Sequence, residues 1–474
     1  MGERIPPTSC GALSENPTAF PMSPRTKFPG PRGGWLLGSL PALRKDILDF
    51  FAACQRDYGD AAYFRVGRRR SMLLSHPSDI EQVLVTDNRQ FIKNFALSFF
   101  LRPLLGNGLL INEGESWLRQ RRLIQPTFAR PRLEFYSQAM VELTDRMLGK
   151  WRSGEERDLA REMMQLTMGI AGKTLLGVDV GDRYREVVVC LEGVMRDFLA
   201  RFRSPLPIPY WLPTPGNWWL KRTIRRLDGV LQQMIDERRT AIDREGESRG
   251  DFLSLLISAR DEHDGRPLLN QQLRDEVMTM FLAGHETTAN ALSWTWYLLG
   301  QHPVEQQRVQ GEVDDVLRGR LPTPADVPRL TFCDRVIREA MRLYPPAYVI
   351  GRRCEEDCTI GKHFIPAMTN VLMSQWVVQR DERWFPEPDA FLPDRWTPEF
   401  SHSLPKYAYF PFGGGPRACI GKEFAMLEAT LILATMAQRV ELSLVDKEPM
   451  PILPAITLRP AKPLVMKVRK GGGD

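Results

Sequence analysis

A single cysteine stands in a glycine-rich stretch near the C-terminus, FGGGPRACIGK (residues 412–422). An apolar helical pattern begins at Lys422, directly after this stretch. Cysteine acts as a nucleophile or a metal ligand only as thiolate, and the unpaired N–H groups at a helix start favour the anion. The neighbouring glycines let backbone amides approach the sulfur of Cys419, Phe412 shields it, and Arg417 offers a cation to a carboxylate nearby. The stretch therefore predicts a loop that holds one thiolate.

Other cysteine chemistries fit this stretch less well. A zinc site requires further cysteines or histidines at short spacing, and the nearest histidine is His402, 17 residues before Cys419. A cysteine hydrolase requires a base beside its nucleophile, and nothing in the loop supplies one. The pair Cys354 and Cys358 looks like half of a metal site without a second half, and we interpret both cysteines as structural. A shielded, solitary thiolate suits the proximal ligand of a haem iron.

The cysteine stretch resembles the haem-binding signature F-x-x-G-x-R-x-C-x-G of the cytochrome P-450 family. The resemblance implies that Cys419 binds the iron of haem b and that the other matching residues surround the cofactor. It covers most of the chain, because further family motifs occur in the same order. The residues that match the signature are Phe412, Gly415, Arg417, Cys419 and Gly421.

A second motif lies within a predicted helix from about residue 269 to residue 300. The stretch FLAGHETTANALSW (281–294) resembles the family's A/G-G-x-D/E-T motif. Gly284 costs about 1 kcal/mol relative to alanine inside a helix, and its missing side chain lets a flat ligand lie against the backbone. By resemblance, Thr287 and Glu286 are the catalytic alcohol–acid pair that helps deliver protons during oxygen activation. The alternative is a helix–helix contact that uses glycine and threonine for close packing.

Two further matches concern the carboxylates of the cofactor. The stretch ESWLRQRR places Trp117 and Arg121 one helical turn apart and resembles the family's W-x-x-x-R, whose side chains hold a haem propionate. Arg352 matches the position of another propionate-binding arginine. Without the resemblance, Trp117 reads as a core residue and Arg121 as a solvated one. The expected cofactor-binding residues are Trp117, Arg121, Gly284, Arg352, Phe412, Gly415, Arg417 and Gly421.

The stretches EAMRLYPP and FLPDRW resemble the E-x-x-R and P-x-R-W segments of the same family. Glu339 and Arg342 share one helical face, and the resemblance makes Arg395 their partner. A desolvated Glu–Arg–Arg cluster is geometrically demanding and can fix the position of the cysteine loop. The alternative for E-x-x-R alone is an ordinary surface ion pair. We therefore expect a structural and not a catalytic role. Where the family usually has histidine in a later His-Arg-Asp, this chain has Gln379.

The hydrophobic patterns predict a mainly helical chain with small β-sheets. Helical periodicity dominates from about residue 115 to residue 260, and again at 269–300 and 331–343. Alternating segments at 60–76 and 345–378 predict strands, and residues 451–470 predict a further hairpin. The sheets are expected to join strands that lie far apart in sequence.

The expected fold class is mainly α with small β-sheets, the cytochrome P-450 fold. The haem is expected between the helix of Glu286 and Thr287 and the helix that follows Cys419. With 474 residues and 43% hydrophobic residues, the chain can bury a large core. We predict a flexible Pro- and Ser-rich tail over residues 1–27 and a single haem-thiolate monooxygenase domain over residues 28–474.

The resemblance implies a haem-thiolate monooxygenase that inserts one oxygen atom of O2 into a lipophilic substrate. No flavin or nicotinamide fingerprint is visible, so electrons are expected from a separate ferredoxin or flavodoxin. One alternative keeps the fold and runs peroxide-driven oxygenation or an isomerisation, although the pair of Glu286 and Thr287 argues against it. Another is a non-catalytic haem sensor or carrier, which would need an output domain.

The substrate class follows from apolar segments of the sequence. By resemblance, the substrate pocket is lined by the segment after Phe95, by residues 347–350 and by the turn at 456–458, all apolar. This predicts a terpenoid, fatty acid or polyketide-like substrate. The Pro- and aromatic-rich segment 204–219 is expected to be an irregular lid, with contact to a membrane surface as the alternative.

The remaining expectations concern partners. The net charge of +6 is a modest basic excess without basic–aromatic interleaving, so no nucleic acid is expected. No stretch approaches the roughly 20 apolar residues of a transmembrane segment. We expect a cytoplasmic monomer.

Overall fold

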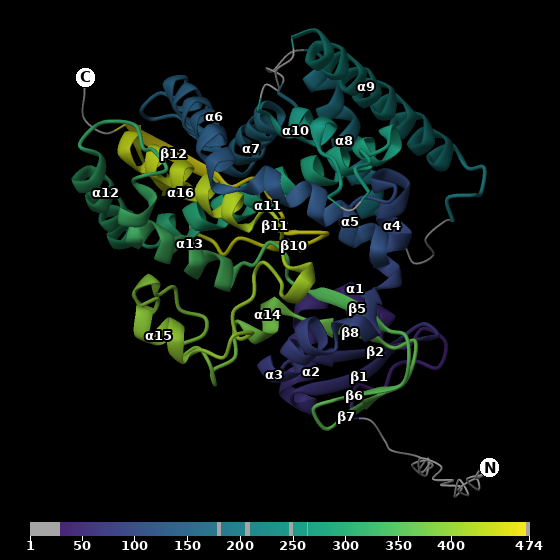
Figure 1. Cartoon of the computed structure of the whole chain (residues 1–474). Coiled ribbons are helices and arrows are strands. Elements are labelled where there is room, and N and C mark those ends of the chain that lie inside the picture. Colours follow the sequence, from purple (N-terminus) through teal and green to yellow (C-terminus); the bar gives the residue numbers. More distant parts are fainter. Residues whose placement is uncertain (1–28, 178–181, 204–208, 246–249, 263, 471–474) are drawn as a thin grey trace, which may run out of the picture.

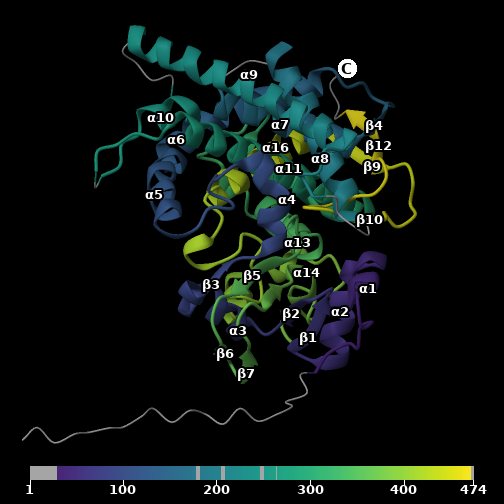
Figure 2. The same cartoon turned by 90° about the vertical axis from the view of Figure 1, so that its right-hand side faces the viewer.

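The computed structural model describes residues 29–177, 182–203, 209–245, 250–262 and 264–470. The predicted tail at 1–27 lies outside these residues. Figures 1 and 2 show a large helical part and a smaller part that carries the main sheet together with α1, α2 and α3. The predicted fold class, mainly α with small sheets, is confirmed. Among the described residues, no helix combines the length and the apolar character required to cross a bilayer.

Helices α5 to α11, α13 and α16 occupy the segments in which the hydrophobic periodicity predicts helices, whereas α1, α2, α4, α12, α14 and α15 lie outside those segments. The π-helix η1 (Gln82–Thr86) continues α3. The α-helices are α1 (Leu40–Lys45), α2 (Ile47–Tyr58), α3 (Pro77–Glu81), α4 (Phe95–Leu105), α5 (Gly114–Ile124), α6 (Arg130–Gly149), α7 (Leu159–Leu175), α8 (Asp182–Arg203), α9 (Pro215–Glu245), α10 (Phe252–Ser258), α11 (Asn270–Gln301), α12 (Pro303–Leu317), α13 (Thr331–Leu343), α14 (Gln375–Val378), α15 (Pro398–Ser403) and α16 (Lys422–Arg439).

The strands form small sheets from distant segments, as predicted. The five-stranded sheet has the order β1-β2-β8-β5-β3, and the hairpin of β1 and β2 is the one expected at residues 60–76. The strands are β1 (Ala61–Val66), β2 (Arg69–Leu74), β3 (Phe91–Lys93), β4 (Glu156–Asp158), β5 (Ile350–Cys354), β6 (Cys358–Ile360), β7 (His363–Ile365), β8 (Asn370–Met373), β9 (Val440–Leu444), β10 (Ile452–Pro454), β11 (Leu458–Pro460) and β12 (Val465–Lys470).

Two expectations about local structure need correction. Residues 451–470 form more than one hairpin: β10 pairs with β11, whereas β12 pairs with β9 and β4. Within the predicted irregular lid, α9 already begins at Pro215, so Trp218 and Trp219 are helical. Proline is favoured at the first helical position because its missing N–H is not needed there. Residues 204–208 of the same segment lie outside the described residues.

Helix α11 forms the centre of the helical part and positions the site. It packs against α7, α13 and α16, and most of its side chains are buried (Figure 1). Helix α13 contributes Val336 and Ala340, four residues apart, to the same hydrophobic core. Helix α16 contributes Leu431 and Ala434. This core holds α11 and the start of α16 at fixed positions.

Candidate active site

A cavity of about 360 Å3 is lined by α11, the start of α16 and the loop that precedes α16. Further lining residues come from α5, α7, α13 and α14, from strands β3 and β5, and from the loops that connect them. Two of the predicted site residues, Glu286 and Gly415, do not line it. The predicted residues that the cavity brings together are Trp117, Arg121, Gly284, Thr287, Arg352, Phe412, Arg417, Cys419 and Gly421.

The cysteine loop folds back on itself before α16 begins. The backbone N–H of Cys419 donates to the Phe412 carbonyl oxygen at 2.9 Å, and the N–H of Gly421 donates to the Cys419 sulfur. Gly415 has a φ of 65° and approaches η1 so closely that a Cβ would lie 1.8 Å from the Leu84 carbonyl oxygen. Gly415 therefore shapes the loop where it crosses η1 and does not contact the cavity.

The Cys419 side chain opens into the cavity. Burial raises the pKa of this thiol, while the Gly421 N–H and the Arg121 guanidinium act in the opposite direction. In the protein without cofactor, desolvation therefore outweighs the helix start and the backbone amides that are expected to favour the thiolate. A thiolate at this position therefore requires a cation next to the sulfur. A coordinated metal ion meets this requirement, because it deprotonates a thiol outright.

Four cationic side chains converge on one end of the cavity: Lys93, Arg121, Arg352 and Arg417. Burial, followed by repulsion from Arg352 and Arg417, holds the pKa of Lys93 well below its usual range. Burial and Arg417 together lower the pKa of Arg352 to about 10. Among the described residues, Glu113 is the one carboxylate paired with this cluster, through Arg417. The cluster is short of negative charge, which a ligand with carboxylate groups would supply.

Lys93 is a cavity residue that the motif analysis missed. It lies on β3 directly opposite Arg352 of β5 in an antiparallel register. The two residues are 259 positions apart in sequence, and only the strand pairing brings them together. No short motif around residue 93 marks it.

Trp117 forms the wall between these cations. The guanidinium of Arg417 lies 3.8 Å from the centroid of the Trp117 ring, and that of Arg121 lies 5.9 Å from it. Arg121 also donates to the Ala418 carbonyl oxygen at 3.0 Å. Arg121 therefore connects α5 to the cysteine loop.

The predicted acid–alcohol pair of α11 is divided between two sides of the helix. Thr287 faces the cavity, and its hydroxyl donates to the Ala283 carbonyl oxygen at 2.8 Å. Glu286 is buried outside the cavity wall, where it accepts hydrogen bonds from Thr457 and, at 2.8 Å, from Arg459. Successive helical residues point about 100° apart, which separates the two side chains.

Gly284 makes room for a flat ligand against α11. A Cβ at this position would meet only the Leu175 side chain, at 3.9 Å, so the space beside it belongs to the cavity. This face of α11 and the segment with Cys419 line the same cavity. The cavity wall thus combines one sulfur, a helix face of small residues and a cluster of cations. These features fit an iron porphyrin with two propionates.

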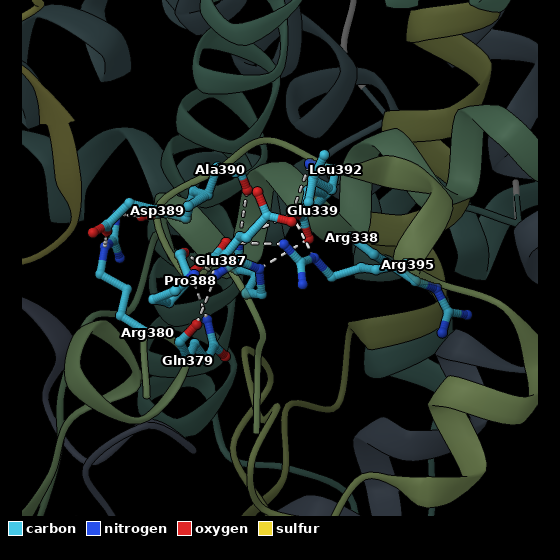
Figure 3. A network of polar contacts seen from close by, with 12 residues as sticks. Arg338, Glu339, Gln379, Arg380, Glu387, Pro388, Asp389, Ala390, Leu392 and Arg395 are labelled. Atoms are coloured by element: carbon cyan, nitrogen blue, oxygen red, sulfur yellow. Dashed lines mark hydrogen bonds and ion pairs between the residues drawn. The ribbon is translucent and has the colours of Figure 1, made fainter. Parts of the chain in front are cut away.

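The E-x-x-R segment forms a buried polar network with Gln379 and Arg395 (Figure 3). Glu339 and Arg342 are fully buried, and Arg342 donates to both carboxylate oxygens, at 2.9 and 2.8 Å. Arg395 donates to the same carboxylate at 3.0 Å. Gln379 accepts from the Phe410 N–H at 3.2 Å and donates to the Arg342 carbonyl oxygen at 3.1 Å. The glutamine that departs from the family pattern therefore links this network to the cysteine loop.

A family model described as cytochrome P-450 matches residues 28–468. The chain belongs to the cytochrome P-450 family. Haem b is accordingly its cofactor, and the protein is a haem-thiolate monooxygenase that uses O2. The crystal structure of the cytochrome P-450DA heme domain superimposes with a TM-score of 0.85 and 28% identity, covering 94% of this chain and 97% of that one.

Curated relatives of this P-450 include two proteins of Streptomyces melanosporofaciens. Cyclooctatin synthase is 37% identical over 86% of this chain and 88% of its own length. Cyclooctat-9-en-7-ol 5-monooxygenase is 36% identical and covers 93% of both chains. Pentalenene oxygenase of Streptomyces avermitilis is 35% identical over 80% of this chain and 83% of its own length.

Proposed function

We propose that this cytochrome P-450 oxygenates a terpenoid. The observation that carries the proposal is the apolar wall of the cavity that Thr287 also lines. It consists of aliphatic side chains with few polar groups, which suits a hydrocarbon skeleton. Three relatives carry names that refer to cyclooctatin, cyclooctat-9-en-7-ol and pentalenene. The wall residues are Leu109, Leu110, Leu175, Met280, Ala283, Ala291, Ala347 and Ile350.

This wall agrees with the expected pocket in two of three segments. Leu109 and Leu110 belong to the segment after Phe95, and Ala347 and Ile350 to the segment 347–350. The turn at 456–458 does not line the cavity: it packs behind α11, where Thr457 bonds to Glu286. The expected contact of this turn with substrate is therefore replaced by a contact with the acid of α11.

Titration of the ferric protein tests the substrate class. Pentalenene and cyclooctat-9-en-7-ol are expected to displace water and shift the spin state at micromolar concentration, on the order of −8 kcal/mol of binding free energy. A straight-chain fatty acid is the control, because its carboxylate has no partner in the aliphatic wall. A spin shift with the fatty acid and none with either terpenoid would contradict the assignment.

Haem b, when bound, supplies the activation of O2 and the transfer of one oxygen atom to the substrate. We propose that Cys419 is the iron ligand and that Phe412 and Gly421 enclose it. We propose further that Lys93, Arg121 and Arg352 hold the propionates. The support is that the cationic cluster lines the same cavity as the sulfur and that, within the described part of the chain, Glu113 is its one carboxylate partner.

Changing Arg352 to glutamine tests the propionate role. Loss of one charge-assisted hydrogen bond, at about 1.5–3 kcal/mol, is expected to speed haem transfer to an excess of apomyoglobin about 10- to 100-fold. The matched control is Arg353→Gln, since Arg353 is the next residue on β5 and strand side chains alternate between faces. Equal haem loss from both variants would remove Arg352 from the propionate site.

We propose that Thr287 presents a proton at the cavity and that Glu286 replenishes it from behind α11. The Thr287 hydroxyl already lies at the cavity surface, where rotation about χ1 exchanges its bond to Ala283 for one to a ligand. Glu286 is tied to Arg459, whose side chain is partly exposed and provides a route to solvent. In this proposal Thr287 donates the proton at the cavity, and Glu286, on another side of the helix, restores it.

Changing Thr287 to valine removes the hydroxyl and keeps the shape. Product formed per electron pair is expected to fall on the order of 100-fold, with the electrons diverted to hydrogen peroxide, because general acid catalysis is worth about that factor. Product and peroxide are quantified together at fixed electron supply. Thr287→Ser is expected to restore most of the yield. Unchanged yield in Thr287→Val would show that another group supplies the proton.

We propose that electrons come from a separate ferredoxin or flavodoxin and that residues 28–474 form one domain. We further propose a cytoplasmic monomer. The purified chain is expected to be inactive with NADPH alone and active once a ferredoxin and its reductase are added. Light scattering during gel filtration is expected to give the mass of one chain, 54.3 kDa. Turnover without a partner protein would refute the first proposal.

A further inference from the structure

Three consecutive side chains near the start of α11 hold one short piece of backbone. Arg274, Asp275 and Glu276 all bond to residues 104–109, the end of α4 and the loop that follows it. All three side chains are buried. Each of the three side chains is at most 5% exposed, and charged residues are rarely buried to this extent unless they are paired. Hydrogen bonds to the backbone of residues 104–109 explain why all three charged side chains are buried.

Arg274 joins three elements. Its guanidinium donates to the Leu104 carbonyl oxygen of α4 at 2.6 Å and to the Asp228 carboxylate of α9 at 2.7 Å. It also donates to Asp275 at 3.1 Å. The charge of Arg274 is therefore matched within the cluster, and the end of α4 is anchored to α11 and α9 together.

The Asp275 carboxylate binds the backbone of the turn that follows α4. The Asn107 N–H donates to one carboxylate oxygen at 2.8 Å. Gly106 has a φ of 56°, and a Cβ there would lie 2.2 Å from both oxygens of this carboxylate. Only glycine lets the loop approach this closely.

Glu276 holds the last residue of the loop. The carboxyl is fully buried and accepts from the Leu109 N–H at 3.0 Å. Its second oxygen has no hydrogen-bond partner among the described residues. Burial raises the pKa of Glu276 to about 8, and nearby Asp275 acts in the same direction. Burial therefore favours the neutral carboxylic acid, for which glutamine is a close substitute.

The loop ends where the substrate wall begins. Leu109 and Leu110 line the cavity, as do Thr279 and Met280, one turn beyond Glu276 on α11. A Cβ at Gly108 would lie 2.0 Å from the Thr279 hydroxyl, so loop and helix are in direct contact there. A shift of the loop against α11 therefore changes the shape of the substrate space.

We propose that Glu276 is a positioning residue for substrate specificity, which fixes Leu109 and Leu110 against α11 and so sets the shape of the cavity. Asp275 and Arg274 support it by anchoring the preceding turn. The inference rests on the proposed function, because it takes this cavity as the place where substrate meets haem. It adds that specificity depends on a residue that contacts neither of them.

The test compares two azoles that coordinate iron, imidazole and the bulky clotrimazole, in the haem-loaded protein. Glu276→Leu removes the acceptor for the Leu109 N–H. Imidazole affinity is expected to stay within about twofold of the unchanged protein, whereas clotrimazole affinity is expected to fall about tenfold, since only the bulky azole reaches the loop. Glu276→Gln keeps an acceptor for Leu109 and is expected to restore clotrimazole binding.

A second variant reaches the same loop from the other side. Gly106→Ala leaves Glu276 intact and pushes the turn away from Asp275, and it is expected to weaken clotrimazole binding in the same way. Equal clotrimazole affinity in Gly106→Ala and in Glu276→Leu, at the level of the unchanged protein, overturns the inference. If Glu276→Leu does not fold, Gly106→Ala decides: weakened clotrimazole binding with unchanged imidazole binding supports the inference, and unchanged clotrimazole binding overturns it.

Haem content and the carbon monoxide spectrum of the unchanged protein separate the two proposals. A normal spectrum with clotrimazole binding that no variant alters contradicts the role of Glu276 and leaves the proposed function standing. Failure of the unchanged protein to bind haem through sulfur contradicts both.

Discussion

Changing Cys419 to alanine is expected to abolish the haem-thiolate spectrum and the oxygenase activity while leaving the chain folded. Among the residues that the structure describes, Cys419 is the one cysteine that lines the cavity, and no histidine lines it. Removal of the sulfur therefore leaves no side chain in the wall that could bind iron in the same way. Activity is expected to fall by more than about 100-fold, because even loss of an outer-shell partner of a metal typically costs 10- to 100-fold.

The fold is expected to survive this change for a structural reason. The loop is held by its backbone, through the Cys419 N–H and the Phe412 carbonyl oxygen, and by the φ of 65° at Gly415. Alanine preserves both features. Circular dichroism and absorbance spectra on the same sample measure fold and haem ligation together. The matched control is Cys358→Ala, which removes a thiol outside the cavity and is expected to leave the spectrum unchanged.

Changing Glu339 to alanine is expected to cost about 3–5 kcal/mol of folding free energy, the usual penalty for breaking a buried ion pair. The carboxylate accepts five hydrogen bonds, from Arg342 twice and from Leu392, Arg395 and Trp396. Its removal leaves two buried guanidinium groups without their counter-charge. Since whole domains are stable by about 5–15 kcal/mol, most of the variant is expected to be recovered without haem or insoluble.

The measurement for Glu339→Ala is the ratio of haem to protein in the soluble fraction, together with the thermal midpoint. Glu423→Ala is the matched control, because Glu423 is exposed at the start of α16 and pairs only loosely, at 3.7 Å, with Lys422. Full haem loading and an unchanged midpoint in Glu339→Ala would show that the network does not hold the cysteine loop in place.

Local patterns predicted most of the fold and the motif part of the site. Helices α11 and α13 begin and end within about one residue of the expected bounds, because each has a strong amphipathic or apolar pattern. The cysteine loop was predictable for a similar reason: its glycines, its cation and its sulfur lie within ten residues. The resemblance places Gly415 beside the cofactor, whereas the close approach to η1 that shapes its backbone is visible only in the structure.

Contacts between distant segments could not be predicted in the same way. Lys93 reaches the cavity through its register opposite Arg352, and a strand register is not visible in one strand alone. Glu286 points away from the cavity because of its place on the helix, but its partners there, Thr457 and Arg459, lie more than 170 positions later in the sequence. The same turn then cannot line the substrate space, which explains why the expected pocket segment at 456–458 is absent from the wall.

The role of Cys419 as an anionic iron ligand is the central claim, and the spectrum of the unchanged protein tests it most directly. The purified protein is reduced with dithionite, exposed to carbon monoxide and recorded against the reduced sample. A Soret band at the long-wavelength position typical of thiolate-bound haem is the predicted result. A band at the position of neutral-ligand haem, from protein that is fully folded and loaded with haem, would contradict the account.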